Sequence, residues 1–179
     1  MAESFSNSLK RAVGIVTTSS SGSIGVTTNL ITGISTVGVA VSSLVDNTNF
    51  IAGTKVSSIG VGQVVVDRNS TNTSATSNQV IRFLGVTTAY TSPSGTKSIL
   101  IGGTFANNTN NQVNLTVEIY DSSAGIGAAI ASKIPVPAGS SFVISDTGKT
   151  LLEGLDELRI YCDTANAIDA NLSILTGVA

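Results

Sequence analysis

The chain has 179 residues, of which only 11% are charged, and its nine Lys and Arg face eleven Asp and Glu. An average soluble domain is about a quarter charged, so this surface is built mainly from Ser, Thr, Asn and Gly. Nucleic acid is excluded as an expected partner, because no stripe of positive charge could neutralise phosphates and aromatic residues for base stacking make up only 4%. A sparsely charged surface favours a protein that is covered by neighbours in an assembly. A small soluble domain of unusual composition is the other interpretation.

Missing residue types narrow the chemistry further. The chain has no His, which removes the usual general base and the commonest metal ligand. Cys162 is the single cysteine, so neither a disulfide nor a thiolate metal site can form within one chain. Apolar runs are too short for a membrane span, and residues 12–16 are too short for the apolar region of a secretory signal. We therefore expect no cofactor, no metal, no small-molecule substrate, no membrane partner and synthesis in a cytoplasm.

The N-terminal residues predict an arm. Phe5, Leu9, Ala12 and Val13 recur at helical spacing, which indicates a short amphipathic turn or arm that is too short to be stable alone. Such an arm needs a surface to pack against. We therefore take Phe5, Leu9, Lys10 and Arg11 as the candidate assembly interface, with a disordered terminus as the alternative.

A small β module follows the arm. Alternating valines at 37, 39 and 41, and a Val- and Ile-rich stretch at 55–66 broken by glycines, predict short strands and hairpins. Residues 69–78 are almost wholly Ser, Thr and Asn, which is typical of a linker. The sequence therefore predicts one region over 1–75, containing arm and module, and a second domain over 79–179.

The second domain shows the clearest strand pattern. Apolar and polar side chains alternate in 112–120, 157–162 and 168–174, which is the period-two signature of half-buried strands. Further candidate strands lie at 80–86, 97–105, 128–134, 142–145 and 149–152. Turn-forming clusters separate them at 92–95, 107–111, 135–139, 146–148 and 163–166. This pattern predicts an all-β fold in which an antiparallel β-sandwich, jelly-roll-like, forms the C-terminal half.

Motifs that could carry chemistry are incomplete. Gly148-Lys149-Thr150 resembles the end of a phosphate-binding loop, but Val143 stands where that loop needs a glycine. Glu153, Asp156 and Glu157 lie close enough in sequence to suggest a carboxylate-based hydrolase, but the chain has no Trp and few other aromatics to line a sugar cleft. We therefore expect no catalytic residue and a protein that is not an enzyme.

Several segments resemble a known family. The C-terminal half contains, in order, the segments Tyr90-Thr91-Ser92-Pro93-Ser94-Gly95-Thr96, Val136-Pro137-Ala138-Gly139-Ser140-Ser141 and Leu151-Leu152-Glu153-Gly154-Leu155-Asp156-Glu157-Leu158-Arg159-Ile160. They resemble a small β-sandwich module of virion structural proteins in tailed bacteriophages, including cyanophages. Leu155 departs from the small residue common there. The N-terminal half adds Leu44-Val45-Asp46-Asn47, Phe50-Ile51-Ala52-Gly53-Thr54-Lys55-Val56 and Ser58-Ile59-Gly60, which are similar to short β segments of phage fibre and tail proteins.

The resemblance implies a virion protein made in the cytoplasm of a bacterial host. It would decorate or stabilise the capsid, neck or tail, as a homo-oligomer and through contacts with other virion proteins. The alternative is a receptor- or carbohydrate-binding module on a phage fibre, with exposed loop residues such as Tyr120 and Asp121 as candidate contacts.

Overall fold

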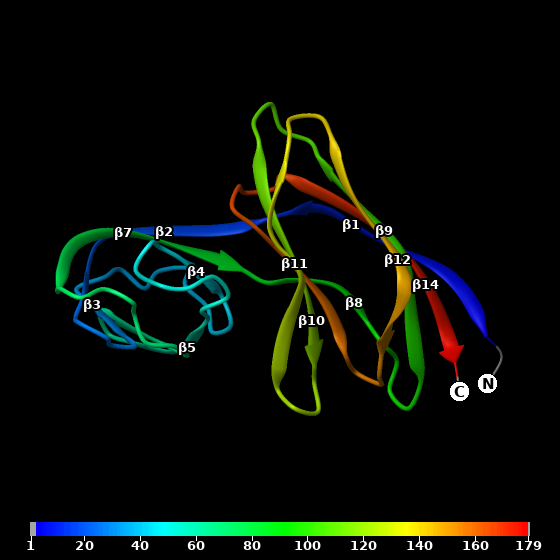
Figure 1. The fold of residues 1–179 in the computed structure, drawn as a ribbon, viewed down its shortest axis with the longest axis horizontal. Coiled ribbons are helices and arrows are strands. Elements are labelled where there is room, and N and C mark those ends of the chain that lie inside the picture. The colour runs from blue at the N-terminus through cyan, green and yellow to red at the C-terminus, as the bar shows by residue number, and fades with distance from the viewer. Residues whose placement is uncertain (1–2, 179) are drawn as a thin grey trace. The chain divides into compact units, whose positions relative to one another are not determined.

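The computed structural model describes residues 3–178, with the side chains of 146–148 outside that description. All regular elements in the described residues are β-strands, and the predicted all-β class is confirmed. The chain forms two compact units (Figure 1). The first unit combines the N-terminal residues up to Gly14 with those from Thr87 onward, and the second comprises Ile15–Val86.

The first unit contains two four-stranded antiparallel sheets. One has the order β1-β14-β9-β12 and the other the order β11-β10-β13-β8. The bounds are β1 Ser4–Val13, β8 Thr87–Thr91, β9 Lys97–Asn107, β10 Val113–Asp121, β11 Ile126–Val136, β12 Ser141–Leu152, β13 Glu157–Cys162 and β14 Ile168–Val178.

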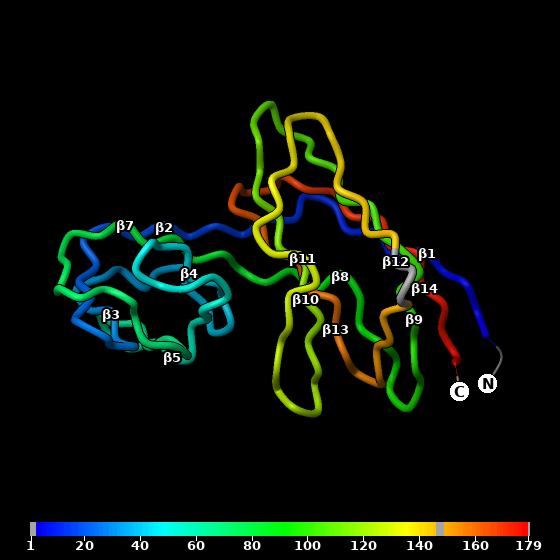
Figure 2. Tube along the Cα trace, in the orientation of Figure 1, coloured from blue at the N-terminus to red at the C-terminus, as the bar shows by residue number. Residues whose placement is uncertain are grey.

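The strand order identifies a jelly roll. The unit has eight strands, β1 and β8 to β14, which we number one to eight in chain order. One sheet then has the order 1-8-3-6 and the other the order 2-7-4-5. Most connections between consecutive strands therefore cross from one sheet to the other. This arrangement, eight strands in two sheets, is the jelly-roll variant of the β-sandwich. The first strand therefore pairs with the last, and Figure 2 shows β1 in blue beside β14 in red. The second unit is inserted between the first and second strands of the jelly roll.

One hydrophobic core joins the two jelly-roll sheets. Alternate residues of β10 and β14 point inward, so Leu115, Val117 and Leu172 are fully buried, together with Phe105 from β9 and Ile160 from β13. These residues come from both sheets, as sandwich packing requires. The period-two pattern seen in the sequence therefore marks the residues that hold the sheets together.

The second unit is one six-stranded antiparallel sheet with the order β4-β7-β2-β3-β6-β5. The bounds are β2 Ile15–Ile24, β3 Leu30–Thr32, β4 Leu44–Asp46, β5 Val56–Gly60, β6 Gln63–Val66 and β7 Thr76–Gly85. The two ends of this sheet meet, because the Val45 amide donates to the Thr54 carbonyl at 2.8 Å and the Val56 amide to that of Ser43 at 2.9 Å. The sheet thus closes around its own core, which includes Ile81 and Phe83.

The predicted N-terminal helical turn is wrong, because residues 4–13 form β1, an edge strand of the jelly roll. Phe5 and Leu9 are four residues apart, and this spacing places side chains on one face of a helix or of a strand alike. Ser4, Ser6 and Ser8 alternate with them, and pairing with β14 decides for the strand.

The boundary expected at 69–78 also differs from the structure. Ser70 is buried in the second unit, where its hydroxyl accepts a hydrogen bond from the Thr28 amide at 3.0 Å. Residues from Thr76 onward belong to β7, which pairs with β2. The chain thus passes between units at 14–15 and 86–87 instead. A polar composition does not make a linker where hydroxyls and amides find backbone partners.

The other predictions are mostly confirmed. All eight candidate strands between 80 and 174 correspond to observed strands, with 142–145 and 149–152 joined in β12, and 55–66 forms the β5–β6 hairpin. The valines at 37, 39 and 41 are not in a strand, since hydrogen bonds from Val39 to Thr36 and from Ser43 to Ala40 close turns there. The turn predicted at 146–148 lies outside the described side chains.

Candidate functional site

Phe5 and Leu9, two of the predicted interface residues, lie on a sheet face that carries several exposed large apolar side chains. Phe5 is 76% exposed and Leu9 68% exposed on β1, and the same outer face of the β1-β14-β9-β12 sheet presents Val143 and Leu151 of β12 and Ile101 of β9. Ile99 and Leu175 lie half-buried between them. We call this set the outer apolar face.

The register explains how these residues come together. Phe5, Leu175, Ile99 and Leu151 are aligned across the four strands, so one row of the face is apolar from edge to edge. Ile101 has no partner on β14, because the register shifts there, and this bulge adds a further exposed side chain. Sequence spacing alone could not show the row, since its members come from four strands.

Lys10 and Arg11 lie at one end of the outer apolar face. They line a depression of about 300 Å³ together with Leu9, Asp169 and Asn171. The Arg11 guanidinium lies 3.9 Å from the Asp169 carboxylate, and both side chains are substantially exposed, so this pair adds little stability. The Asp169 carboxylate also accepts a hydrogen bond from the Ala12 amide at 2.8 Å, which holds β1 where its register shifts.

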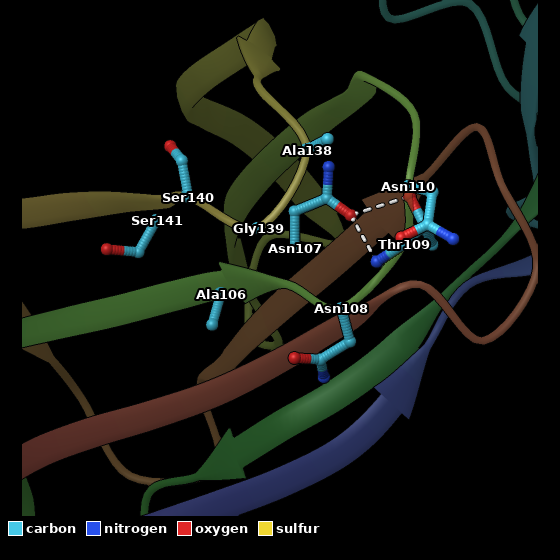
Figure 3. A pocket seen from close by; sticks show the side chains of 9 residues that line it. All are labelled: Ala106, Asn107, Asn108, Thr109, Asn110, Ala138, Gly139, Ser140 and Ser141. Atoms are coloured by element: carbon cyan, nitrogen blue, oxygen red, sulfur yellow. Dashed lines mark hydrogen bonds between the residues drawn. The ribbon is translucent and has the colours of Figure 1, made fainter.

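A second, polar depression lies where two loops of the jelly roll meet. The end of β9 and the loop after it supply Asn107, Asn108, Thr109 and Asn110, and the loop before β12 and the first residue of that strand supply Ala138, Gly139, Ser140 and Ser141 (Figure 3). Its volume is about 600 Å³. Its exposed amides and hydroxyls can donate and accept hydrogen bonds, which is the chemistry that a sugar or a peptide backbone would meet.

Asn107 is the structural centre of this depression. Its buried amide nitrogen lies 2.8 Å from the Asn111 carbonyl, 2.9 Å from that of Val136 and 3.1 Å from that of Pro137. Its amide oxygen accepts from the Thr109 amide at 2.9 Å and from the Thr109 hydroxyl at 2.8 Å. Asn107 thus holds the two loops together.

The carboxylates considered for hydrolysis have separate partners. Asp156 accepts hydrogen bonds from the amides of Ser122 at 3.1 Å and Glu153 at 2.9 Å, which makes it a turn-forming residue. Glu157 accepts from Arg159 at 2.7 Å. The Glu153 carboxylate lies 3.8 Å from Lys97 at the surface.

The outer side of the other jelly-roll sheet carries a network of charged and aromatic side chains. The Arg159 guanidinium lies 3.4 Å from the centre of the Tyr120 ring and binds Glu157. The Tyr161 hydroxyl is fully buried and donates to Glu118 at 3.4 Å. Burial raises the pKa of Tyr161 well above its ordinary value, and the negative charge of Glu118 adds to this shift.

The residues proposed as exposed loop contacts lie at the end of β10 and are half-buried, and both have structural partners. Tyr120 lies under Arg159. Asp121 accepts hydrogen bonds from the amides of Ala124 and Ser123, both at 2.9 Å, and from the Ser123 hydroxyl at 2.7 Å. The Ala124 amide, followed by the Ser123 hydroxyl, lowers the pKa of Asp121. Asp121 therefore shapes the turn after β10.

Within the described residues, no group of three or more Cys, Asp or Glu side chains lies together in a way that could hold a metal ion. The described part of the chain also has no helix long and apolar enough to cross a membrane. No protein-family model, no curated protein and no solved structure matches this chain.

Proposed function

We propose that this chain is a non-enzymatic structural protein of a tailed-bacteriophage virion, which decorates or stabilises the capsid, neck or tail. The sequence resemblance supports the viral setting, and the low charge supports a surface that neighbours cover. Jelly rolls occur in viral capsid proteins and also in lectins and cupins, so the fold is compatible with this function without requiring it.

The outer apolar face is the observation that carries the proposal. Single exposed apolar residues are ordinary, but here five large ones gather on one side of one sheet. Contiguous apolar surface of this kind marks a site of contact with another molecule. In a particle with many copies, symmetry would repeat the contact and add its modest strength many times over.

Particle composition tests the proposal directly. Purified phage particles from the source lysate are analysed by mass spectrometry and by labelling with an antibody against this chain. We expect the chain in the particle at a fixed ratio to the major capsid protein, with a non-structural phage protein absent from the same preparation as the control. Absence of the chain from intact particles would contradict the proposal.

The polar depression favours a second candidate, a receptor- or carbohydrate-binding module on a fibre. Asn108 and Asn110 present amides beside the hydroxyls of Ser140 and Ser141, without an aromatic platform for a sugar ring. A glycan array separates the two candidates. Specific binding that Asn110→Ala and Ser141→Ala abolish, while the Leu9→Ala control retains it, would favour recognition over a purely structural function.

A further inference from the structure

The register arranges the outer apolar face in rows, in which two rows with large side chains, called ridges here, flank a row of small residues, called the groove. The first ridge is the aligned row of Phe5, Leu175, Ile99 and Leu151. Four residues along β1, the second ridge aligns Leu9 with Asn171, Thr104 and Val143.

Between the ridges, the aligned residues are Asn7, Ser173, Gly102 and Ser145, and the bulge residue Ile101 lies next to Gly102 on the side of the first ridge. All four are small or short and none is charged. A row of small residues between two rows of larger ones can receive a ridge from another surface. A second copy of this same face supplies such a ridge, because its first ridge fits the groove of its partner and its own groove receives the ridge in return.

The apolar side chains of the face supply most of the area that a specific interface needs. Phe5, Leu9, Val143, Leu151 and Ile101 are between 40% and 76% exposed. These fractions correspond to roughly 600 Å² of surface on apolar residues, which is at the upper limit for the largest patch of an ordinary monomer. A standard interface buries about 800 Å² on each partner. The groove residues and the ridge residues Asn171 and Thr104 supply the remainder.

The charges at the two ends of the face also suit a second copy. One end carries Arg11 beside Asp169, and the other carries Lys97 beside Glu153. The first end also carries Lys10, so it holds two cations and one anion, whereas the second holds one of each. A strongly charged partner would gain little from such a face, and an antiparallel second copy avoids placing the two Lys10–Arg11 ends against each other.

We propose that the outer apolar face is covered by a second copy of this chain, in a twofold dimer whose β1-β14-β9-β12 sheets pack face to face. The inference deepens the proposed structural function and rests on it, because it names one of the contacts that would build the assembly. The dimer would pack the jelly rolls of two chains through the face that β1 and β14 create.

Sedimentation analysis of the full chain over a range of concentrations tests this proposal. We expect a concentration-dependent dimer. Ser173→Lys places a charge in the groove at an exposed position. We therefore expect the dissociation constant of the dimer to rise by about tenfold or more. Ser58→Lys makes the same change at an exposed position of β5 in the other unit, and we expect the dimer to persist.

A second variant protects the test against misfolding. Phe5→Ala removes a side chain that is largely in solvent, so the monomer should keep its unfolding transition while the dimer weakens. A wild-type chain that stays monomeric at every concentration, a trimer in place of a dimer, or a dimer that neither Ser173→Lys nor Phe5→Ala weakens would each overturn the proposal. Because particle composition is measured separately, a chain found in particles but monomeric in solution would refute the dimer alone.

Discussion

Val13 and Ile168 lie opposite each other where the first strand of the jelly roll pairs with the last, and both side chains are buried in the core. Two residues that are remote in sequence thus attach β1 to the edge of one sheet. This attachment continues beyond the strand, where the Ala167 amide donates to the Val13 carbonyl at 2.9 Å and the Asn166 amide donates to that of Gly14 at 3.0 Å.

Gly14 is the residue at which the chain leaves the jelly roll, and we expect Gly14→Ala to be severely destabilising. Its φ angle is +126°, and an added Cβ would collide with the Thr164 carbonyl oxygen. Backbone strain together with a steric clash should cost several kcal/mol in the free energy of unfolding measured in urea. Gly139→Ala is the control, because its φ angle is +64° with open space around the site, and it should cost only about 1 kcal/mol. Equal losses in the two variants would contradict the steric argument.

A substitution at Leu115 measures how much the core between the two sheets contributes to stability. It is fully buried, so Leu115→Ala should lower the free energy of unfolding by about 2–5 kcal/mol. Leu151→Ala makes the same change on the outer apolar face and should cost under about 1 kcal/mol in the monomer. Chemical denaturation followed by circular dichroism measures both. A similar loss at both positions would show that Leu151 is covered within the chain.

Asn107→Ala should destabilise the jelly roll although the residue is polar. The substitution removes the hydrogen bonds from the Asn107 amide to the carbonyls of Asn111, Val136 and Pro137 and takes away the acceptor of Thr109, so a cost of about 2–3 kcal/mol is expected. The Asn111 carbonyl keeps the Thr109 hydroxyl as a donor, and the Pro137 carbonyl keeps the Ser140 amide. Asn110→Ala, in the same loop, is the matched control and should change the unfolding midpoint little. An unchanged midpoint for Asn107→Ala would mean that the two loops are held by other contacts.

The buried phenol of Tyr161 should make the free energy of unfolding depend on pH in alkaline solution. Its pKa is raised in the folded state, so the folded protein keeps the phenol neutral while the unfolded chain ionises near pH 10. This contribution to stability is complete below pH 10 and is lost as the pH rises above it. Tyr161→Phe should therefore remove part of the alkaline loss, at a cost of about 1 kcal/mol at neutral pH for the hydrogen bond to Glu118. The free energy of unfolding, measured from pH 8 to about 11, should then fall less steeply with pH in Tyr161→Phe than in the wild type. Equal slopes for the two proteins would contradict the assignment to Tyr161.

The sequence by itself determined the class of fold and most of its strands. Alternation in 112–120, 157–162 and 168–174 marked β10, β13 and β14, because a strand in a sandwich buries every second side chain. The turn clusters at 92–95, 107–111 and 163–166 were equally readable, since Gly, Pro and Asn favour particular backbone angles. The missing histidine and the scarce charge limited the chemistry that could be expected. The sequence also predicted Phe5 and Leu9 as contact residues, and the structure shows that both are exposed.

Only the tertiary structure decided how these strands are connected. The spacing of Phe5 and Leu9 fits a helix and a strand alike, and β14, remote in sequence, selects the strand. The Ser- and Thr-rich β2 has too little apolar alternation to be recognised, yet it pairs with β7. The outer apolar face draws its rows from four strands, so no local pattern could reveal it. Pairing between distant strands supplies this information, because backbone hydrogen bonds across a sheet depend on register and not on neighbours in sequence.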